Sequence, residues 1–251
     1  MSNLARKSNA EYLELLISGV RGSVDILKLS PTELYKLNPV VTYDEAGKPF
    51  NYFRDEQWNY KAYANQNTNR VEAKYIVSYR TLTISNELMS ELKTVVLHTV
   101  AKDYPKNNNA RVGQVLFEQT SKFFIDLNAR NQKSITSFSH PVSLLETLSR
   151  IGDKYAFGTL QSSLYGLQKI TKLKVPTLEF SLPVDKGGML DSNKENTLNG
   201  LAKKYCRSGT EIANQTLYIP SCVHSQMMNS AFEMICEGEK IIERISGFFK
   251  E

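Results

Sequence analysis

Residues 85–175 carry apolar side chains three and four residues apart, and no other sequence feature restricts the fold of this chain as strongly. Ser85 is a suitable N-cap, and the spacing after it predicts a helix whose buried stripe is Leu88, Leu92, Val95, Val96 and Val100. The Tyr-Pro-Lys-Asn-Asn-Asn segment at 104–109 predicts a loop that ends this helix. The pattern is typical of a mainly α protein.

Three more helices are predicted before residue 176. The second follows Arg111 and carries Val112, Val115, Leu116, Phe123, Phe124 and Leu127, with a polar and basic turn at 128–133. Pro141 suits the first turn of the third helix, and Gly152 ends it. Thr159 is the predicted cap of the fourth helix, whose apolar side is Leu160, Leu164, Leu167 and Leu173. We therefore expect a four-helix module.

Residues 1–84 are rich in aromatic side chains and are repeatedly interrupted by proline and glycine. The β-branched and aromatic content of 73–84 predicts a strand. One interpretation is an arm that stacks bases or sugars beside Arg54, Lys61 and Arg70. The interpretation we favour is a small irregular region whose tyrosines and tryptophan form its core.

Residues 181–251 form the third part of the predicted organisation, after 1–84 and 85–180. A loop at 182–188 precedes a short helix over 194–206. The Tyr-Ile-Pro-Ser sequence at 218–221 predicts the opening of a long helix that reaches about residue 249. Its apolar spacing indicates packing against a core or a partner helix.

Positive charge is concentrated in the helical middle of the chain. Residues 85–180 contain 12 Lys and Arg against 8 Asp and Glu, whereas the whole chain has a net charge of +5. The polar side of the predicted fourth helix adds Gln161, Ser162, Tyr165, Gln168, Lys169 and Lys172. Amide, hydroxyl and ammonium groups on one helix face suit DNA, although a solvated amphipathic face has the same composition.

Sequence signals for catalysis, metals and membranes are missing. The three histidines, His98, His140 and His224, belong to no metal-binding pattern, and the three cysteines form no CxxC pair. The phosphate-binding glycine motifs are absent, so no cofactor is predicted. We find no signal peptide at the N-terminus and no apolar run of about 18–20 residues, which predicts a cytoplasmic protein without a membrane partner.

Several segments together resemble the N-terminal half of tyrosine recombinases (phage-type integrases). They are Thr83–Leu88, Arg111–Leu127, Leu148–Gly152, the helix 159–173 with Lys174-Val175-Pro176, and the segment 218–225. The resemblance covers residues 80–245 and implies a helical, SAM-like core-binding domain that contacts double-stranded DNA and other recombinase subunits. The family's H-x-x-R motif is missing, because Ala101, Ser143 and Met227 stand three residues after the histidines. We therefore predict DNA binding without catalytic residues or strand cleavage.

The predicted DNA-binding residues lie at the start of the second helix, in the turn after it, and on and after the fourth helix. They are Arg111, Lys133, Gln161, Ser162, Lys169, Lys172 and Lys174. The cations are expected to contact phosphates, and Gln161 and Ser162 to reach the groove. The alternative function is a helical protein-interaction or structural protein with no nucleic-acid role.

Overall fold

A computed structural model describes residues 25–44, 46–63, 72–107, 111–185 and 195–207. The chain divides into one compact unit of residues 1–210 and a second of residues 211–251. All of the described residues belong to the first unit. The long helix predicted over 221–249 lies outside the described residues.

Six α-helices and four short strands make up most of the described structure, together with several 3-10 turns. The helices are α2 (Pro31–Leu37), α3 (Asn86–Asn107), α4 (Val112–Ala129), α5 (Pro141–Ile151), α6 (Phe157–Thr171) and α7 (Leu198–Tyr205). The strands are β1 (Val40–Tyr43), β2 (Pro49–Tyr52), β3 (Gln57–Asn59) and β4 (Ile76–Ser78). The prediction of a mainly α protein is confirmed.

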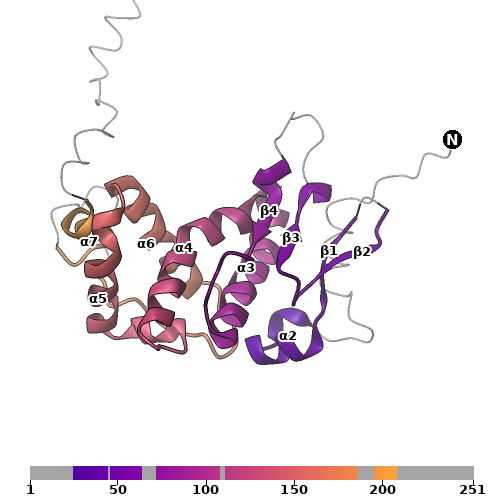
Figure 1. Cartoon of the computed structure of the whole chain (residues 1–251), viewed down its shortest axis with the longest axis horizontal. Coiled ribbons are helices and arrows are strands. Elements are labelled where there is room, and N and C mark those ends of the chain that lie inside the picture. The colour runs from indigo at the N-terminus through magenta and orange to yellow at the C-terminus, as the bar shows by residue number, and fades with distance from the viewer. Residues whose placement is uncertain (1–24, 45, 64–71, 108–110, 186–194, 208–251) are drawn as a thin grey trace, which may run out of the picture. The chain divides into compact units, whose positions relative to one another are not determined.

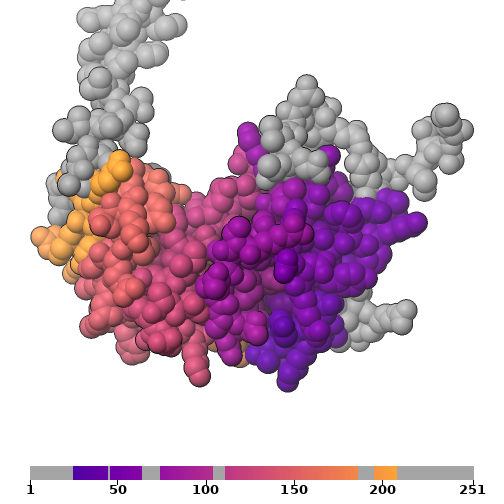
Figure 2. Space-filling view, in the orientation of Figure 1, coloured from indigo at the N-terminus to yellow at the C-terminus, as the bar shows by residue number. Residues whose placement is uncertain are grey.

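The helices pack side by side along one continuous hydrophobic core. Helix α3 packs between α2 and α4, α4 also contacts α5 and α6, and α7 packs on α6 (Figure 1). The buried hydrophobic residues form one cluster, with members from Ile26 to Ala202. The predicted boundary at residue 84 therefore falls inside this core. In the space-filling view the magenta residues from the middle of the chain lie between the indigo N-terminal segment and the salmon helices (Figure 2).

The predicted stripe and cap of α3 are confirmed. The hydroxyl of Ser85 accepts a hydrogen bond from the Leu88 amide at 3.3 Å, and all five apolar residues of the stripe are buried. The predicted loop at 104–109 is wrong over its first four residues, because α3 continues to Asn107. Proline at 105 cannot donate a backbone hydrogen bond, and the helix continues through it all the same.

The predicted second and third helices match α4 and α5, and Pro141 occupies the first turn of α5. The predicted cap of the fourth helix is wrong. Helix α6 begins at Phe157, and Ala156 is its N-cap residue without a side-chain acceptor. Burial of Leu160 and Leu164 fixes the position of α6, so tertiary packing decides its start and the capping preference of Thr159 does not.

Most aromatic side chains of the N-terminal region form its core, as the favoured interpretation predicted. Tyr43, Phe53, Trp58, Tyr60, Tyr63, Tyr75 and Tyr79 are buried. The Tyr79 ring lies 5.1 Å from the ring of Trp58 and 5.3 Å from that of Phe117 on α4, edge to face in both pairs. This region is therefore joined to the helices by aromatic packing.

Two antiparallel strand pairs, β1–β2 and β3–β4, supply the β structure among the described residues. The strand predicted over 73–84 is present only at Ile76–Ser78, because a 3-10 turn over Glu72–Tyr75 precedes it. The helix predicted over 194–206 begins later than expected, at Leu198, where the Thr197 hydroxyl accepts from the Gly200 amide.

Gly152, between α5 and α6, sits against the carbonyl end of α7. A Cβ placed on it would lie 2.3 Å from the carbonyl oxygen of Tyr205, whereas a Cβ on Gly158 would meet nothing within 4 Å. We expect Gly152→Ala to lower the free energy of unfolding by about 1–3 kcal/mol through overpacking. Gly158→Ala, in the first turn of α6, should raise it by about 0.5–1 kcal/mol. Urea unfolding of both variants tests the expected difference in sign, and equal effects would contradict the α7 contact.

Candidate nucleic-acid interface

The structure does not bring the predicted DNA-binding residues onto one surface. Arg111 precedes α4 and Lys133 follows it, and 18 helical residues span about 27 Å. Gln161 and Ser162 lie in the first half of α6, whereas Lys172 and Lys174 follow its end. The seven residues therefore occupy separate ends of two helices.

The polar side of α6 is not the exposed face that its composition suggested. Gln161 and Ser162 are partly buried. The Gln161 amide donates to Asn199 on α7 at 2.8 Å, and the Ser162 hydroxyl accepts from the side-chain amide of Gln119 on α4 at 2.8 Å. Because α4 and α7 cover this face, the prediction that these side chains are presented outward is wrong.

The predicted cations have different surroundings. Lys169 forms an ion pair with Asp103 of α3 and is partly buried, as is Arg111. Lys172 and Lys174 are exposed at the end of α6. Lys133 is exposed beside Glu87. Hydrogen bonds from its own backbone amide and from Ser85 lower the pKa of Glu87, and the charge of Lys133 lowers it further.

A different set of cations lines two adjoining pockets along the outer side of α4. One pocket of about 340 Å³ lies between α4 and the start of α6 and includes Lys122, Thr159, Ser162 and Ser163. The other, of about 230 Å³, is lined by Lys122, Arg150, Lys154 and Tyr155 together with Ile125, Asp126, Ala129 and Ile151. Lys122 belongs to both pockets, and we call the combined depression the α4–α6 groove.

Lys122 is held in place at the centre of the α4–α6 groove. Its ammonium group donates to the Ser163 hydroxyl at 2.6 Å and lies 4.6 Å from the centroid of the Tyr155 ring. Burial lowers the pKa of Lys122, and the charge of Glu118 opposes this shift. The lysine is therefore positioned by α4, α6 and the segment between α5 and α6.

Asp126 is the carboxylate that organises one wall of the groove. It is buried and accepts from the Arg130 Nε at 3.0 Å, the Arg150 Nε at 2.9 Å and the Thr147 hydroxyl at 2.9 Å. Arg130 extends the network to Glu146 at 3.0 Å. Arg130 and Arg150 both bond to Asp126, and the Arg150 side chain stays 53% exposed at the groove. Glu118 is a second carboxylate that lines the groove.

Sequence reasoning missed Lys122, Arg150 and Lys154. Lys122 lies on α4, four residues before Asp126. Arg150 lies on α5, and Lys154 lies in the 3-10 turn that follows it. Only the packing of α5 against α4 brings them to one groove. Of the predicted site residues, Ser162 alone lines it.

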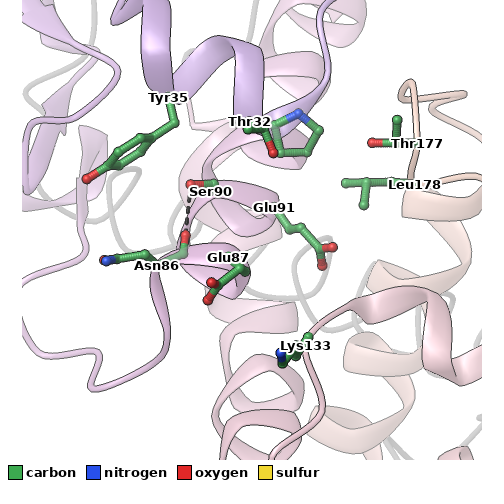
Figure 3. A pocket seen from close by; sticks show the side chains of 10 residues that line it. Thr32, Tyr35, Asn86, Glu87, Ser90, Glu91, Lys133, Thr177 and Leu178 are labelled. Carbon is green, nitrogen blue, oxygen red and sulfur yellow. Dashed lines mark hydrogen bonds between the residues drawn. The ribbon is translucent and has the colours of Figure 1, made fainter.

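A separate pocket, of about 340 Å³, lies between α2, the start of α3 and the chain near residue 178 (Figure 3). Glu87 and Glu91 project into this region from successive turns of α3, with Lys133 below them. Burial raises the pKa of Glu91 to about 7, although hydrogen bonds from Ser134 and from the Ile135 amide oppose the shift. The Ile135 amide donates to Glu91 at 2.8 Å, so this carboxyl connects α3 to the 3-10 turn before α5.

Comparisons with protein-family models, with curated proteins and with solved structures gave no match to this chain. Among the described residues, no helix is both long and apolar enough to span a bilayer.

Proposed function

We propose that this chain binds duplex DNA through the phosphate backbone and that the α4–α6 groove is the contact surface. The observation that carries the proposal is the convergence of Lys122 from α4, Arg150 from α5 and Lys154 from the 3-10 turn after α5 on one groove. Lysine and arginine side chains supply most phosphate contacts in protein–DNA complexes. The groove thus takes the role first assigned to the polar face of α6.

Neutral donors beside these cations support the same proposal. The first turn of α6 opens toward the groove at Gly158 and Thr159, and its N-cap residue Ala156 provides no side-chain acceptor for the first backbone amides. The hydroxyls of Ser162 and Ser163 lie beside them. Backbone amides at a helix start and serine hydroxyls both donate to phosphate oxygens, in addition to the attraction of the cations.

The proposed biological role follows the resemblance to tyrosine recombinases. We propose a non-catalytic, SAM-like helical module that holds DNA during site-specific recombination or integration. The helical character of the described unit and the positive charge of residues 85–180 support this role. The H-x-x-R motif, which strand cleavage in that family requires, is absent from the sequence.

Exposed apolar side chains on α5 favour the second candidate function, a helical protein-interaction module. Val142 is 66% exposed and Leu145 is 37% exposed. They stand three residues apart and share a face of the helix. The pair is small, and the groove with three cations supports DNA binding better.

Paired charge removals distinguish the α4–α6 groove from the end of α6. We expect Lys122→Gln with Lys154→Gln to weaken binding to every duplex by roughly tenfold at low salt, about 1.4 kcal/mol. Lys172→Gln with Lys174→Gln removes the same charge from exposed positions after α6 and should leave affinity within about twofold. Fluorescence anisotropy with a labelled duplex measures both.

Two controls make this comparison decisive. Lys154→Gln alone changes an exposed side chain, so a loss of affinity in that variant does not come from disturbed packing of Lys122. Circular dichroism confirms that each variant folds. A larger loss from the change at 172 and 174 than from the change at 122 and 154 would move the interface away from the groove.

A further inference from the structure

Three side chains at and after β2 form an exposed row on its outer face. Phe50 is 53% exposed, Tyr52 is 41% exposed and Arg54 is exposed, whereas Phe53 between them is buried. Phe50 and Tyr52 belong to β2, whereas Arg54 lies in the turn that follows, where the Asp55 amide donates to the Tyr52 carbonyl oxygen at 3.0 Å. Most aromatic rings of this region are buried in the core, so these two outward rings have no role in it.

Helix α2 adds a third ring to this row. The Arg54 guanidinium donates to the carbonyl oxygens of Tyr35 at 2.7 Å and Lys36 at 3.0 Å. It also lies 5.1 Å from the centroid of the Tyr35 ring, which is 40% exposed. The end of α2 and the end of β2 are thus fastened together, and the row has a fixed geometry. We call Tyr35, Phe50, Tyr52 and Arg54 the aromatic row.

Three cations, Lys36, Lys48 and Arg54, lie at the aromatic row, and the carboxylates of Glu33, Asp44 and Asp55 lie near them, so the local charge is mixed. Lys36 and Lys48 are exposed, and within the described part of the chain no carboxylate lies within 4 Å of either ammonium group or of Arg54.

The nearby acids are engaged by backbone amides instead. Asp44 accepts from Ala46 at 2.9 Å and from Lys48 at 2.8 Å, and Asp55 accepts from Tyr52 at 2.8 Å. A polyanion that approaches the row therefore meets cations which have no competing ion pair.

We propose that the aromatic row binds single-stranded nucleic acid, with bases stacked on Phe50 and Tyr52 and phosphates beside Lys36, Lys48 and Arg54. Exposed rings beside cations are the arrangement that binds single strands without sequence preference. This site is separate from the α4–α6 groove and does not depend on the duplex binding proposed there.

The test uses the full chain and a labelled deoxythymidine oligomer of about 12 nucleotides, which forms no duplex. Phe50→Ala with Tyr52→Ala should weaken binding of the oligomer by at least roughly tenfold, because each stacked base contributes strongly to affinity. The tryptophan pair, Phe50→Trp with Tyr52→Trp, keeps two flat rings and should restore it. The matched control, Val142→Ala with Leu145→Ala, trims two exposed apolar side chains on α5 and should leave binding unchanged.

The same variants separate this site from the groove. Lys122→Gln with Lys154→Gln should weaken duplex binding and leave binding of the oligomer intact, whereas the alanine pair in the row should do the reverse. The proposal is overturned if the unmodified chain does not bind the oligomer at low salt, or if the alanine pair in the row binds it as tightly as the unmodified chain. Unchanged melting temperatures exclude loss of folding as the cause of an effect.

Discussion

Replacement of Asp126 by alanine is expected to lower the free energy of unfolding by about 3–5 kcal/mol. The carboxylate is buried and bonds to Arg130, which directly follows α4, and to Thr147 and Arg150 of α5. Its removal leaves the Arg130 guanidinium, whose side chain is only 11% exposed, without its buried counter-charge. The cost arises because the buried Arg130 guanidinium keeps only the exposed Glu146 as an ion-pair partner, and it exceeds the loss of a surface ion pair.

Asp153→Ala is the matched control for this prediction. It removes a carboxylate of the same kind from an exposed position in the 3-10 turn after α5 and should change stability by less than about 0.5 kcal/mol. Denaturant unfolding of both variants gives the comparison. A loss below about 1 kcal/mol for Asp126→Ala would show that the two arginines find other partners and that the network does not hold α5 on α4.

The second large effect concerns His98 and Glu91, two buried groups of α3 with opposite pH dependence. Burial lowers the pKa of His98 from its usual 6.5 to about 4; the charge of Lys102 adds to the shift and that of Asp25 opposes it. Between pH 6.5 and 4, His98 is protonated in the unfolded chain and neutral in the folded chain. Stability from His98 is therefore complete above pH 6.5 and decreases by about 1.4 kcal/mol per pH unit as the pH falls.

Glu91 behaves in the reverse way. Its pKa is raised from 4.5 to about 7, so the folded chain keeps a proton that the unfolded chain has lost. Stability from Glu91 is complete below pH 4.5 and decreases as the pH rises to about 7. Between pH 4.5 and 6.5 the two contributions cancel. Removal of one group should therefore expose the pH dependence of the other.

Glu91→Gln tests this cancellation, because glutamine retains an oxygen that accepts from the Ile135 amide. We expect the variant to lose about 3 kcal/mol more than the unmodified chain when the pH falls from 6.5 to 4.5. Urea unfolding gives the free energy of unfolding of both proteins at the two pH values. The other carboxylates are the same in both, so their contribution cancels in the difference. Parallel pH profiles would contradict the raised pKa of Glu91.

Helical spacing in the sequence predicted α3, α4 and α5 well, because each has a buried stripe and a local stop or start signal such as Ser85 or Pro141. It placed the end of α3 four residues too early and the N-cap of α6 three residues too late. The start of α6 is set by the burial of Leu160 and Leu164, and no local cap marks it. The polar face of α6 was misjudged because Asn199 and Gln119, which cover it, come from other helices.

The candidate interface was harder to predict from sequence for the same reason. Arg150 belongs to the last turn of α5 and Lys154 to the 3-10 turn after it, whereas Lys122 stands on α4 about 30 residues earlier. Their proximity depends on the packing of α5 against α4, which periodicity does not define. The exposure of Phe50 and Tyr52 likewise could not be separated from the burial of Phe53 without the path of β2.

The affinity of the unmodified chain for a duplex of about 20 base pairs, measured at salt concentrations from about 50 to 200 mM, tests the central claim most directly. Three phosphate contacts by Lys122, Arg150 and Lys154 predict that the logarithm of the association constant falls with the logarithm of salt with a slope near −2.7, about −0.9 for each contact. Absence of duplex binding at the lowest salt, or a slope near zero, would contradict phosphate binding by the α4–α6 groove and favour the protein-interaction alternative.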